Sequence, residues 1–223
     1  MPITETTLAA PSQMLTTVKA AIDELDIGDE NQNARLERFI KRASAKIVSL
    51  TNRVFGEERV TETVRAYGRT QVLLERTPIV QIHEVTYDGN ELTDWEIHDR
   101  AAGILYRRSG WIWGAGLMSS YSGIEDFPAP SSEEAKYTID YTAGYVLPSF
   151  PSSFVRNDSS VDLPFDVEEF CLQLVRLLYF ARATDPQIQS ESIGDYQYLK
   201  GSPITSAFFV DQARFVDKWG RIK

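Results

Sequence analysis

Two histidines and one cysteine are the side chains best suited to catalysis or metal binding in this 223-residue sequence. His83 and His98 could serve as general bases or zinc ligands, and Cys171 as a nucleophile or thiolate ligand. Neither histidine lies in a His-Glu-x-x-His motif, and a single cysteine cannot form an internal disulfide or a cysteine-based metal site. Because Cys171 lies among apolar residues at helical spacing, we expect it to be buried and unreactive.

Other catalytic patterns are equally sparse. The sequence has no Gly-x-Ser-x-Gly elbow, and Gly110, Gly114 and Gly116 lack the lysine of a phosphate-binding loop. The adjacent carboxylates Glu133 and Glu134 could serve a glycosidase, but sequence does not define their separation from other acids. We therefore predict no catalytic residue, no metal, no cofactor and no enzymatic activity. A small hydrolase is the alternative, and turnover of ester or glycoside substrates would reveal it.

Anion binding is a different chemistry that the basic residues between positions 30 and 55 could perform. At 100° per residue, one narrow helical stripe contains Arg35, Arg42, Lys46 and Arg53, with Arg38 at its margin. Such a stripe could face phosphate groups, an acidic partner or another subunit. A solvated helix face is the competing interpretation.

Aromatic and basic residues also gather in two segments that could bind a partner protein. The segment 109–130 mixes glycines with aromatic residues and has no periodicity, which is typical of a packed lid or a binding loop. The segment from Lys200 onward contains five basic residues and two acidic residues. The candidate partner-binding residues are Phe208, Phe209, Arg214, Phe215, Trp219, Arg221, Trp111 and Trp113.

Periodicity predicts the elements that position these residues. Apolar residues recur at three- and four-residue steps over about 12–26, 30–55, 164–183 and 204–219, which predicts four helices. Gly56 would cap the second helix. In the third helix, Pro164 and the acidic residues that follow it suit a helix start, and Leu174 belongs to the face expected to be buried.

Between these helices, residues from about 60 to 145 form a strand-rich region. Alternation over Lys136–Thr142 predicts a half-buried strand, and Ile79–Tyr87 reads as a strand with one bulge. Residues 60–67 and 71–75 are predicted to pair around Gly68, and Trp95–His98 is predicted to pair with Gly103–Arg107. The predicted fold class is α+β, a helical bundle with an inserted antiparallel β region.

Composition narrows the class of protein further. The sequence is 43% hydrophobic and 25% charged, as in ordinary soluble domains, and we expect neither a membrane span nor a signal peptide. Its formal charge of −9 argues against a general nucleic-acid coat. Ten acidic residues against two basic ones lie from Glu125 to Glu169, whereas the end of the chain is basic. This asymmetry suggests contact between copies or a tail aimed at an acidic partner, and ordinary variation of surface charge is the competing interpretation.

Several sequence segments, which occur in the same order as in that family, resemble the head-tail connector (adaptor, or head-completion) proteins of tailed bacteriophages. The resemblance spans roughly Leu36 to Tyr198 and is strongest to the ring that lies directly beneath the portal. The segments are Leu73–Gly89, Trp95–Asp99 with Gly103–Tyr106, Tyr137–Tyr145, the Leu163-Pro164 helix and Ser192–Tyr196. Residues 107–130 and 149–161 depart from the family pattern and look like insertions.

The resemblance implies a structural virion protein at the head-tail interface, assembled in the host cytoplasm. It implies a ring, usually dodecameric, that joins the portal protein to the next tail component (stopper, terminator or tail-neck protein). Genomic DNA would pass through its channel without sequence-specific binding, and no membrane is involved. The alternative is another tail-associated module that recognises protein or glycan through the aromatic loop.

The expected organisation is a single adaptor domain over 1–223. Residues 12–56 and 164–183 would form its helical core, and residues 60–145 its β region with the aromatic loop 109–130. Residues 200–223 would form a C-terminal tail that docks on the portal.

Overall fold

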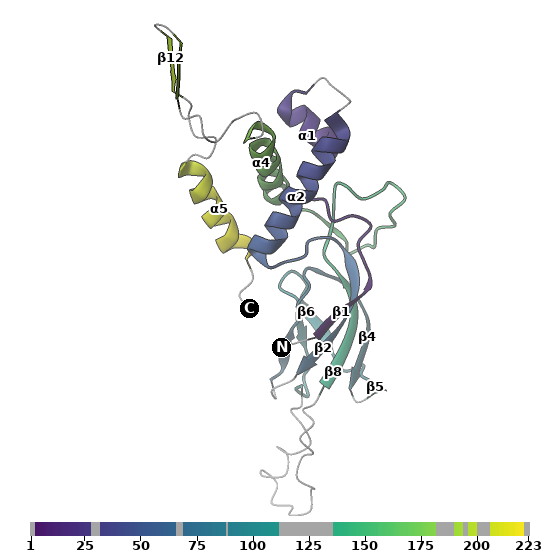
Figure 1. Cartoon of the computed structure of the whole chain (residues 1–223). Coiled ribbons are helices and arrows are strands. Elements are labelled where there is room, and N and C mark those ends of the chain that lie inside the picture. Colours follow the sequence, from purple (N-terminus) through teal and green to yellow (C-terminus); the bar gives the residue numbers. More distant parts are fainter. Residues whose placement is uncertain are drawn as a thin grey trace, which may run out of the picture. The chain divides into compact units, whose positions relative to one another are not determined.

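The chain folds into two compact units in the computed structural model, which describes residues 3–27, 32–65, 69–87, 89–111, 136–181, 190–193, 196–199 and 206–220. One unit, here called the β unit, contains Met1–Pro11, Gly56–Val146 and Ser152–Val161. The other, the helical unit, contains Ser12–Phe55, Leu147–Pro151 and Asp162–Lys223. The predicted α+β class is confirmed (Figure 1). That both units act as a single domain stays a prediction.

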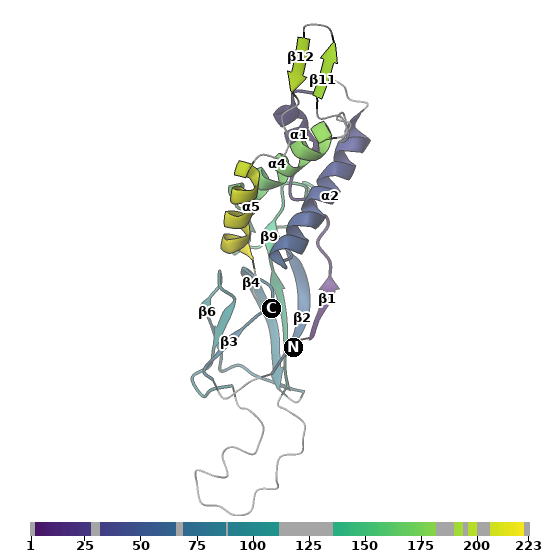
Figure 2. The ribbon, with the colours of Figure 1, turned by 60° about the vertical axis from the view of Figure 1, so that its left-hand side comes forward.

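Two antiparallel sheets build most of the β unit. The larger sheet has the order β1 (Ile3–Leu8), β2 (Glu58–Arg65), β8 (Lys136–Ala143), β4 (Ile79–Tyr87) and β5 (Asn90–Glu91). The smaller sheet has the order β3 (Gln71–Leu73), β7 (Ile104–Tyr106) and β6 (Glu96–Asp99), and Figure 2 shows it beside the larger one. The short strands β9 (Tyr145–Val146) and β10 (Val161–Asp162) form a further pair.

Strand β8 is the centre of the larger sheet and of its core. Its buried residues Tyr137, Ile139, Tyr141 and Ala143 alternate with partly exposed ones, as the period of two predicts. They join a core cluster with residues from β2, β3, β4 and β7. Tyrosine and β-branched side chains suit this position because they cover wide apolar area on a pleated surface.

Strand pairing differs from the sequence prediction in one respect and agrees in two. The predicted pair around Gly68 is wrong: β2 pairs with β8 and β1, and β3 pairs with β7. The bulge in β4 is confirmed between Ile82 and Glu84, and a second irregularity lies between Ile79 and Gln81. The pairing of β6 with β7 is confirmed. Strand β1 was not predicted, because Ile3–Leu8 is mostly polar and forms an exposed edge.

A hydrogen-bond network around buried Glu62 connects two strands of the larger sheet, β2 and β8, with the segment between β3 and β4. The Tyr141 hydroxyl donates to Glu62 Oε2 at 2.6 Å and accepts from the Arg76 backbone N–H at 3.0 Å. Glu62 Oε2 also accepts from the Glu75 backbone N–H at 2.8 Å. Burial, followed by the charge of Glu62, raises the pKa of Tyr141, so the phenol stays protonated and remains a donor. The network anchors the segment between β3 and β4 to the larger sheet.

Four helices of described bounds build the helical unit: α1 (Val18–Leu25), α2 (Asn33–Thr51), α4 (Phe165–Ala181) and α5 (Ser206–Trp219). Helix α2 packs against each of the other three, and Figure 1 shows α2 and α4 side by side. The hairpin strands β11 (Ser190–Ile193) and β12 (Tyr196–Leu199) pair with each other.

The first two helices are shorter than periodicity predicts. Helix α1 begins at Val18 rather than near residue 12, because Thr17 is extended and caps the helix by accepting from the Ala20 N–H at 3.1 Å. Helix α2 ends at Thr51, where Asn52 adopts a left-handed conformation with φ of 51°. Gly56, the predicted cap, lies in the β unit, where it forms a β-bridge with Tyr145.

Gly144 permits the close approach at that bridge. Its φ is +121°, and a Cβ there would lie 2.4 Å from the Gly56 carbonyl oxygen. A side chain at Gly144 would therefore separate the two segments.

Helix α4 confirms the predicted start and corrects one buried position. Asp166 and Glu168 lie in its first turn, where negative charge faces the positive end of the helix dipole. The buried face contains Val167, Phe170, Cys171 and Val175, whereas Leu174 is only half-buried. The buried side of α4 therefore includes Val175, which is 1% exposed, in place of Leu174.

The Tyr141 network generates a stability prediction. We expect Tyr141→Phe to lower the free energy of unfolding by about 1–3 kcal/mol, since it removes a donor to buried Glu62 and an acceptor for the Arg76 N–H. Urea denaturation measures the change. Tyr106→Phe is the matched control and should shift stability by less than about 0.5 kcal/mol, because Tyr106 is half-buried without a described hydroxyl partner. Equal effects of both changes would contradict this role of the network.

The environment of Cys171 generates a reactivity prediction. The thiol is buried 3.7 Å from the Ser44 hydroxyl, and burial raises its pKa to about 12. We expect a thiol-specific chromogenic disulfide reagent to modify Cys171 in denaturant far faster than in the native chain, because the thiolate is the reactive form. Rapid modification of Cys171 in the native chain at neutral pH would show that the packing between α2 and α4 opens.

Candidate interaction surfaces

The residues with catalytic potential do not converge. His83 Nε2 lies 2.8 Å from the Thr142 hydroxyl, and burial together with the nearby Arg59 charge lowers the pKa of the imidazole. His98 packs instead against the Tyr106 ring, with centroids 6.2 Å apart. In the described ranges, no group of three or more His, Cys, Asp or Glu side chains could hold a metal ion. No helix in the same ranges is long and apolar enough to cross a bilayer.

Four of the five residues of the predicted basic stripe lie on one exposed face of α2. Arg35, Arg38, Arg42 and Lys46 are exposed on α2, and none has a hydrogen bond or ion pair within the part of the chain that the structure describes. These four residues are named the α2 basic face. The neighbouring cation Lys41 is paired with Glu37 at 2.7 Å. The opposite side of α2 is buried through Leu36, Ile40, Ala43, Ser44, Ile47 and Thr51.

Arg53 does not belong to this face, which corrects the prediction. Since α2 ends at Thr51, Arg53 no longer follows the helical period. Its guanidinium lies 5.7 Å from the centroid of the Phe55 ring and 5.5 Å from that of Trp219. Arg53 therefore makes cation–π contacts inside the helical unit.

Helix α5, part of the predicted docking tail, is attached to α4. The rings of Phe215 and Phe170 stack with centroids 4.2 Å apart. Asp166 accepts from Lys218 Nζ at 2.6 Å and from Trp219 Nε1 at 2.9 Å. Partial burial opposes ionisation of Asp166, but these two hydrogen bonds outweigh it and hold the pKa of the carboxyl below its usual value. One carboxylate at the start of α4 thus anchors the end of α5.

These contacts change the set of candidate partner-binding residues. Phe215 is 8% exposed and Trp219 is bonded to Asp166, so both are used within the helical unit. Arg214 is exposed and remains available. The side chains of Phe208 and Phe209, and the whole of Trp113 and Arg221, lie outside the described residues.

Trp111 is a further correction, because it is fully buried in the core of the β unit. Its ring meets Tyr137 edge to face, with centroids 5.1 Å apart, and its backbone N–H donates to the Arg69 carbonyl at 2.8 Å. Glycine-rich surroundings suggested exposure, but β8 supplies an aromatic partner that only the fold brings near. Trp111 is thus a core residue and cannot bind a partner without unfolding its surroundings.

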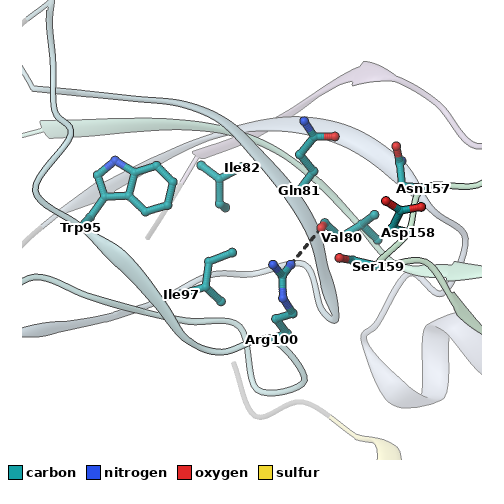
Figure 3. Close-up of a pocket in the computed structure, with 9 residues that line it drawn as sticks. All are labelled: Val80, Gln81, Ile82, Trp95, Ile97, Arg100, Asn157, Asp158 and Ser159. Atoms are coloured by element: carbon teal, nitrogen blue, oxygen red, sulfur yellow. Dashed lines mark hydrogen bonds between the residues drawn. The ribbon is translucent and has the colours of Figure 1, made fainter.

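Sequence reasoning missed a pocket of about 350 Å³ in the β unit. Figure 3 shows an apolar end formed by Ile82, Trp95 and Ile97. The polar remainder is lined by Gln81, Arg100, Asn157, Asp158 and Ser159, and Val80 completes it. Arg100 donates to the Val80 carbonyl at 2.9 Å. No local signal could have revealed this pocket, because Asn157–Ser159 is distant in sequence from β4 and β6.

Apolar side chains that face solvent form another missed feature. On α4, Phe165 is 83% exposed and Phe180 is 49% exposed. Phe165 lies two residues before buried Val167, so a period of 3.6 places it on the opposite face, and this signal could have been read from the sequence. Large exposed aromatic side chains suit contact with another protein.

Charge is divided unequally between the two units. Counting Lys and Arg against Asp and Glu, the β unit has 9 basic and 17 acidic residues and a net charge of −8. The helical unit has 14 basic and 15 acidic residues and a net charge of −1. The α2 basic face therefore belongs to the nearly neutral unit.

Comparison with solved structures finds a similar fold in chains of gene transfer agent particles. A chain of the virion of a native gene transfer agent (GTA) particle matches with a TM-score of 0.57 at 15% identity. Chains from the neck of an empty GTA particle computed with C6 symmetry and of a native one computed with C12 symmetry match with TM-scores of 0.55 and 0.54, at 15% and 14% identity. Each match covers 99% of this chain and 96% of the other. No protein-family model and no curated protein matches the sequence.

The Asp166 anchor generates a pH prediction. A carboxyl whose pKa is lowered by folding stabilises the native state above its unfolded pKa, and this stabilisation disappears as the pH falls through the folded value. We therefore expect Asp166→Asn to destabilise the α5 attachment at neutral pH, and the difference from wild type to disappear as the pH falls through the lowered pKa of Asp166. Hydrogen exchange of α5 amides measures the attachment. A difference that persists unchanged at low pH would contradict the role of charge.

Proposed function

We propose that this chain is a structural protein of the neck of a phage-like particle, where it forms an oligomeric ring that connects the capsid portal to the tail and surrounds the DNA exit channel. The observation that carries the proposal is the full-length fold similarity to chains of GTA particles, two of them from necks computed with sixfold and twelvefold symmetry. The similarity includes both units, since 99% of the chain is matched.

The sequence resemblance supports the same function independently of the fold comparison. The segments that resemble connector proteins lie in both units, including β4 and β8 of the β unit and the start of α4 in the helical unit. The proposed partners are the portal protein, the next tail component and further copies of this chain. The protein would act in the virion after assembly in the host cytoplasm, without an enzymatic step.

The surface of α4 supplies a candidate contact between copies. In a ring, each subunit presents two different surfaces to its two neighbours, and many modest contacts act together. Phe165 and Phe180 are exposed aromatic side chains that such a contact would bury. Arg214 on α5 is a candidate for docking on the portal, because it is exposed and basic in the predicted tail.

The function is tested by measuring assembly. We expect the purified 25.2 kDa chain to form a discrete oligomer, alone or on addition of its portal protein, in mass photometry and electron microscopy. Particles that lack the protein should package DNA but fail to join tails. Two results together would refute the proposal. The purified chain would remain a single subunit in the presence of the portal protein, and particles that lack the chain would still join tails normally.

Substitution of the exposed aromatic residues tests the contact between copies. Phe165→Ser should weaken the oligomer while circular dichroism and urea stability stay close to wild type, since a side chain that is 83% exposed contributes little to the fold. Gln173→Ser is the control, because Gln173 is exposed on the same helix but is polar. Equal oligomerisation of the Phe165→Ser and wild-type chains would exclude Phe165 from the interface.

A further inference from the structure

The α2 basic face is the largest concentration of unneutralised cations among the described residues of the helical unit. Helix α2 contains five basic residues and one acidic residue, and the single acid, Glu37, is paired with Lys41. Arg35, Arg38, Arg42 and Lys46 keep their charges exposed to solvent without a described partner. Their spacing places them within one stripe along three turns of the helix.

The residues beside these cations point to a polyanion rather than a protein partner. The exposed positions on this side are small or polar, as at Ala45 and Ser49, and the aromatic Phe39 beside them is half-buried rather than exposed. Protein interfaces have an apolar centre enriched in aromatic residues, whereas interfaces with DNA are polar and strongly basic. Three of the four cations are arginine, whose planar guanidinium binds phosphate oxygens with two hydrogen bonds.

The length of the face matches a run of phosphates. Arg35 and Lys46 are eleven residues apart, which corresponds to about 16 Å along a helix. Duplex DNA has one charge per about 1.7 Å of its axis, so any alignment of the helix along the backbone brings several phosphates within reach. Such binding requires no base contact and therefore no particular sequence.

We infer that the α2 basic face binds the phosphate backbone of duplex DNA without sequence preference. The inference rests on the proposed function, in which a ring surrounds the DNA channel, and it adds the surface that meets the DNA. The excess of negative charge lies in the β unit, at −8 against −1 for the helical unit. At 0.1 M salt, charges more than about 10 Å from the phosphates are largely screened, so binding through α2 is short-ranged and depends on salt.

The test is the salt dependence of DNA binding by the full chain. Fluorescence anisotropy of a short labelled duplex is followed between about 50 and 200 mM KCl. We compare wild type with Arg38→Gln/Arg42→Gln, which removes two charges from the face. The matched control is Lys19→Gln/Lys41→Gln, which removes two charges from exposed positions of α1 and α2 outside the face. Circular dichroism verifies that both variants are folded.

The expected result is a logarithmic salt slope that falls by about 1.8 in the Arg38→Gln/Arg42→Gln variant, since each phosphate contact contributes about 0.9. The control should keep the wild-type slope. The inference is overturned if wild type shows no salt-dependent binding, or if both variants lose the same slope. It is also overturned if the Arg38→Gln/Arg42→Gln variant loses assembly with protein partners but keeps its DNA affinity, which would identify an acidic protein as the ligand.

The outcome is separable from that of the proposed function. A wild-type chain that forms the ring and joins the portal but does not bind DNA would leave the proposed function standing and remove this inference. A chain that binds DNA through the α2 basic face but never assembles would support this inference and remove the proposed function.

Discussion

The burial of one side of α2 organises the helical unit and determines which residues of this helix stay exposed to solvent. Leu36, Ile40 and Ile47 are completely buried, and covering each contributes on the order of 1.5–3 kcal/mol. The Ser44 hydroxyl accepts from the Leu15 N–H at 3.0 Å on the same side, which ties the segment before α1 to α2. Because a helix has a period of 3.6 residues, this packing leaves Arg35, Arg38, Arg42 and Lys46 in water.

Aromatic residues that look suited to partners are instead used within each unit. Trp111 fills the β core against Tyr137, and Phe215 stacks on Phe170 in the helical unit. Asp166 then holds Lys218 and Trp219, so the last turns of α5 are attached to the start of α4. In the helical unit, α2 therefore presents exposed cations, and α4 presents the exposed aromatic side chains Phe165 and Phe180.

Local patterns predicted much of the secondary structure but not every strand pairing or helix end. Alternation located β8 and the phase shift located the bulge of β4, because both depend on neighbouring residues. The pairing of β2 was wrong, since any strand of period two can accept several partners and the choice depends on residues such as Tyr141, some 80 positions away. The end of α2 was also wrong, because Asn52 rather than Gly56 takes the left-handed conformation.

The sequence alone determined the α+β class, the amphipathic faces of the helices and four of the five cations of the basic stripe. These properties depend on side-chain type and on fixed backbone periods. Tertiary structure decided the burial of Trp111, the attachment of α5 through Asp166, the separation of Arg53 from the stripe and the pocket around Arg100. Each of these depends on side chains distant in sequence, whose proximity arises only when the apolar surfaces of the whole chain are packed.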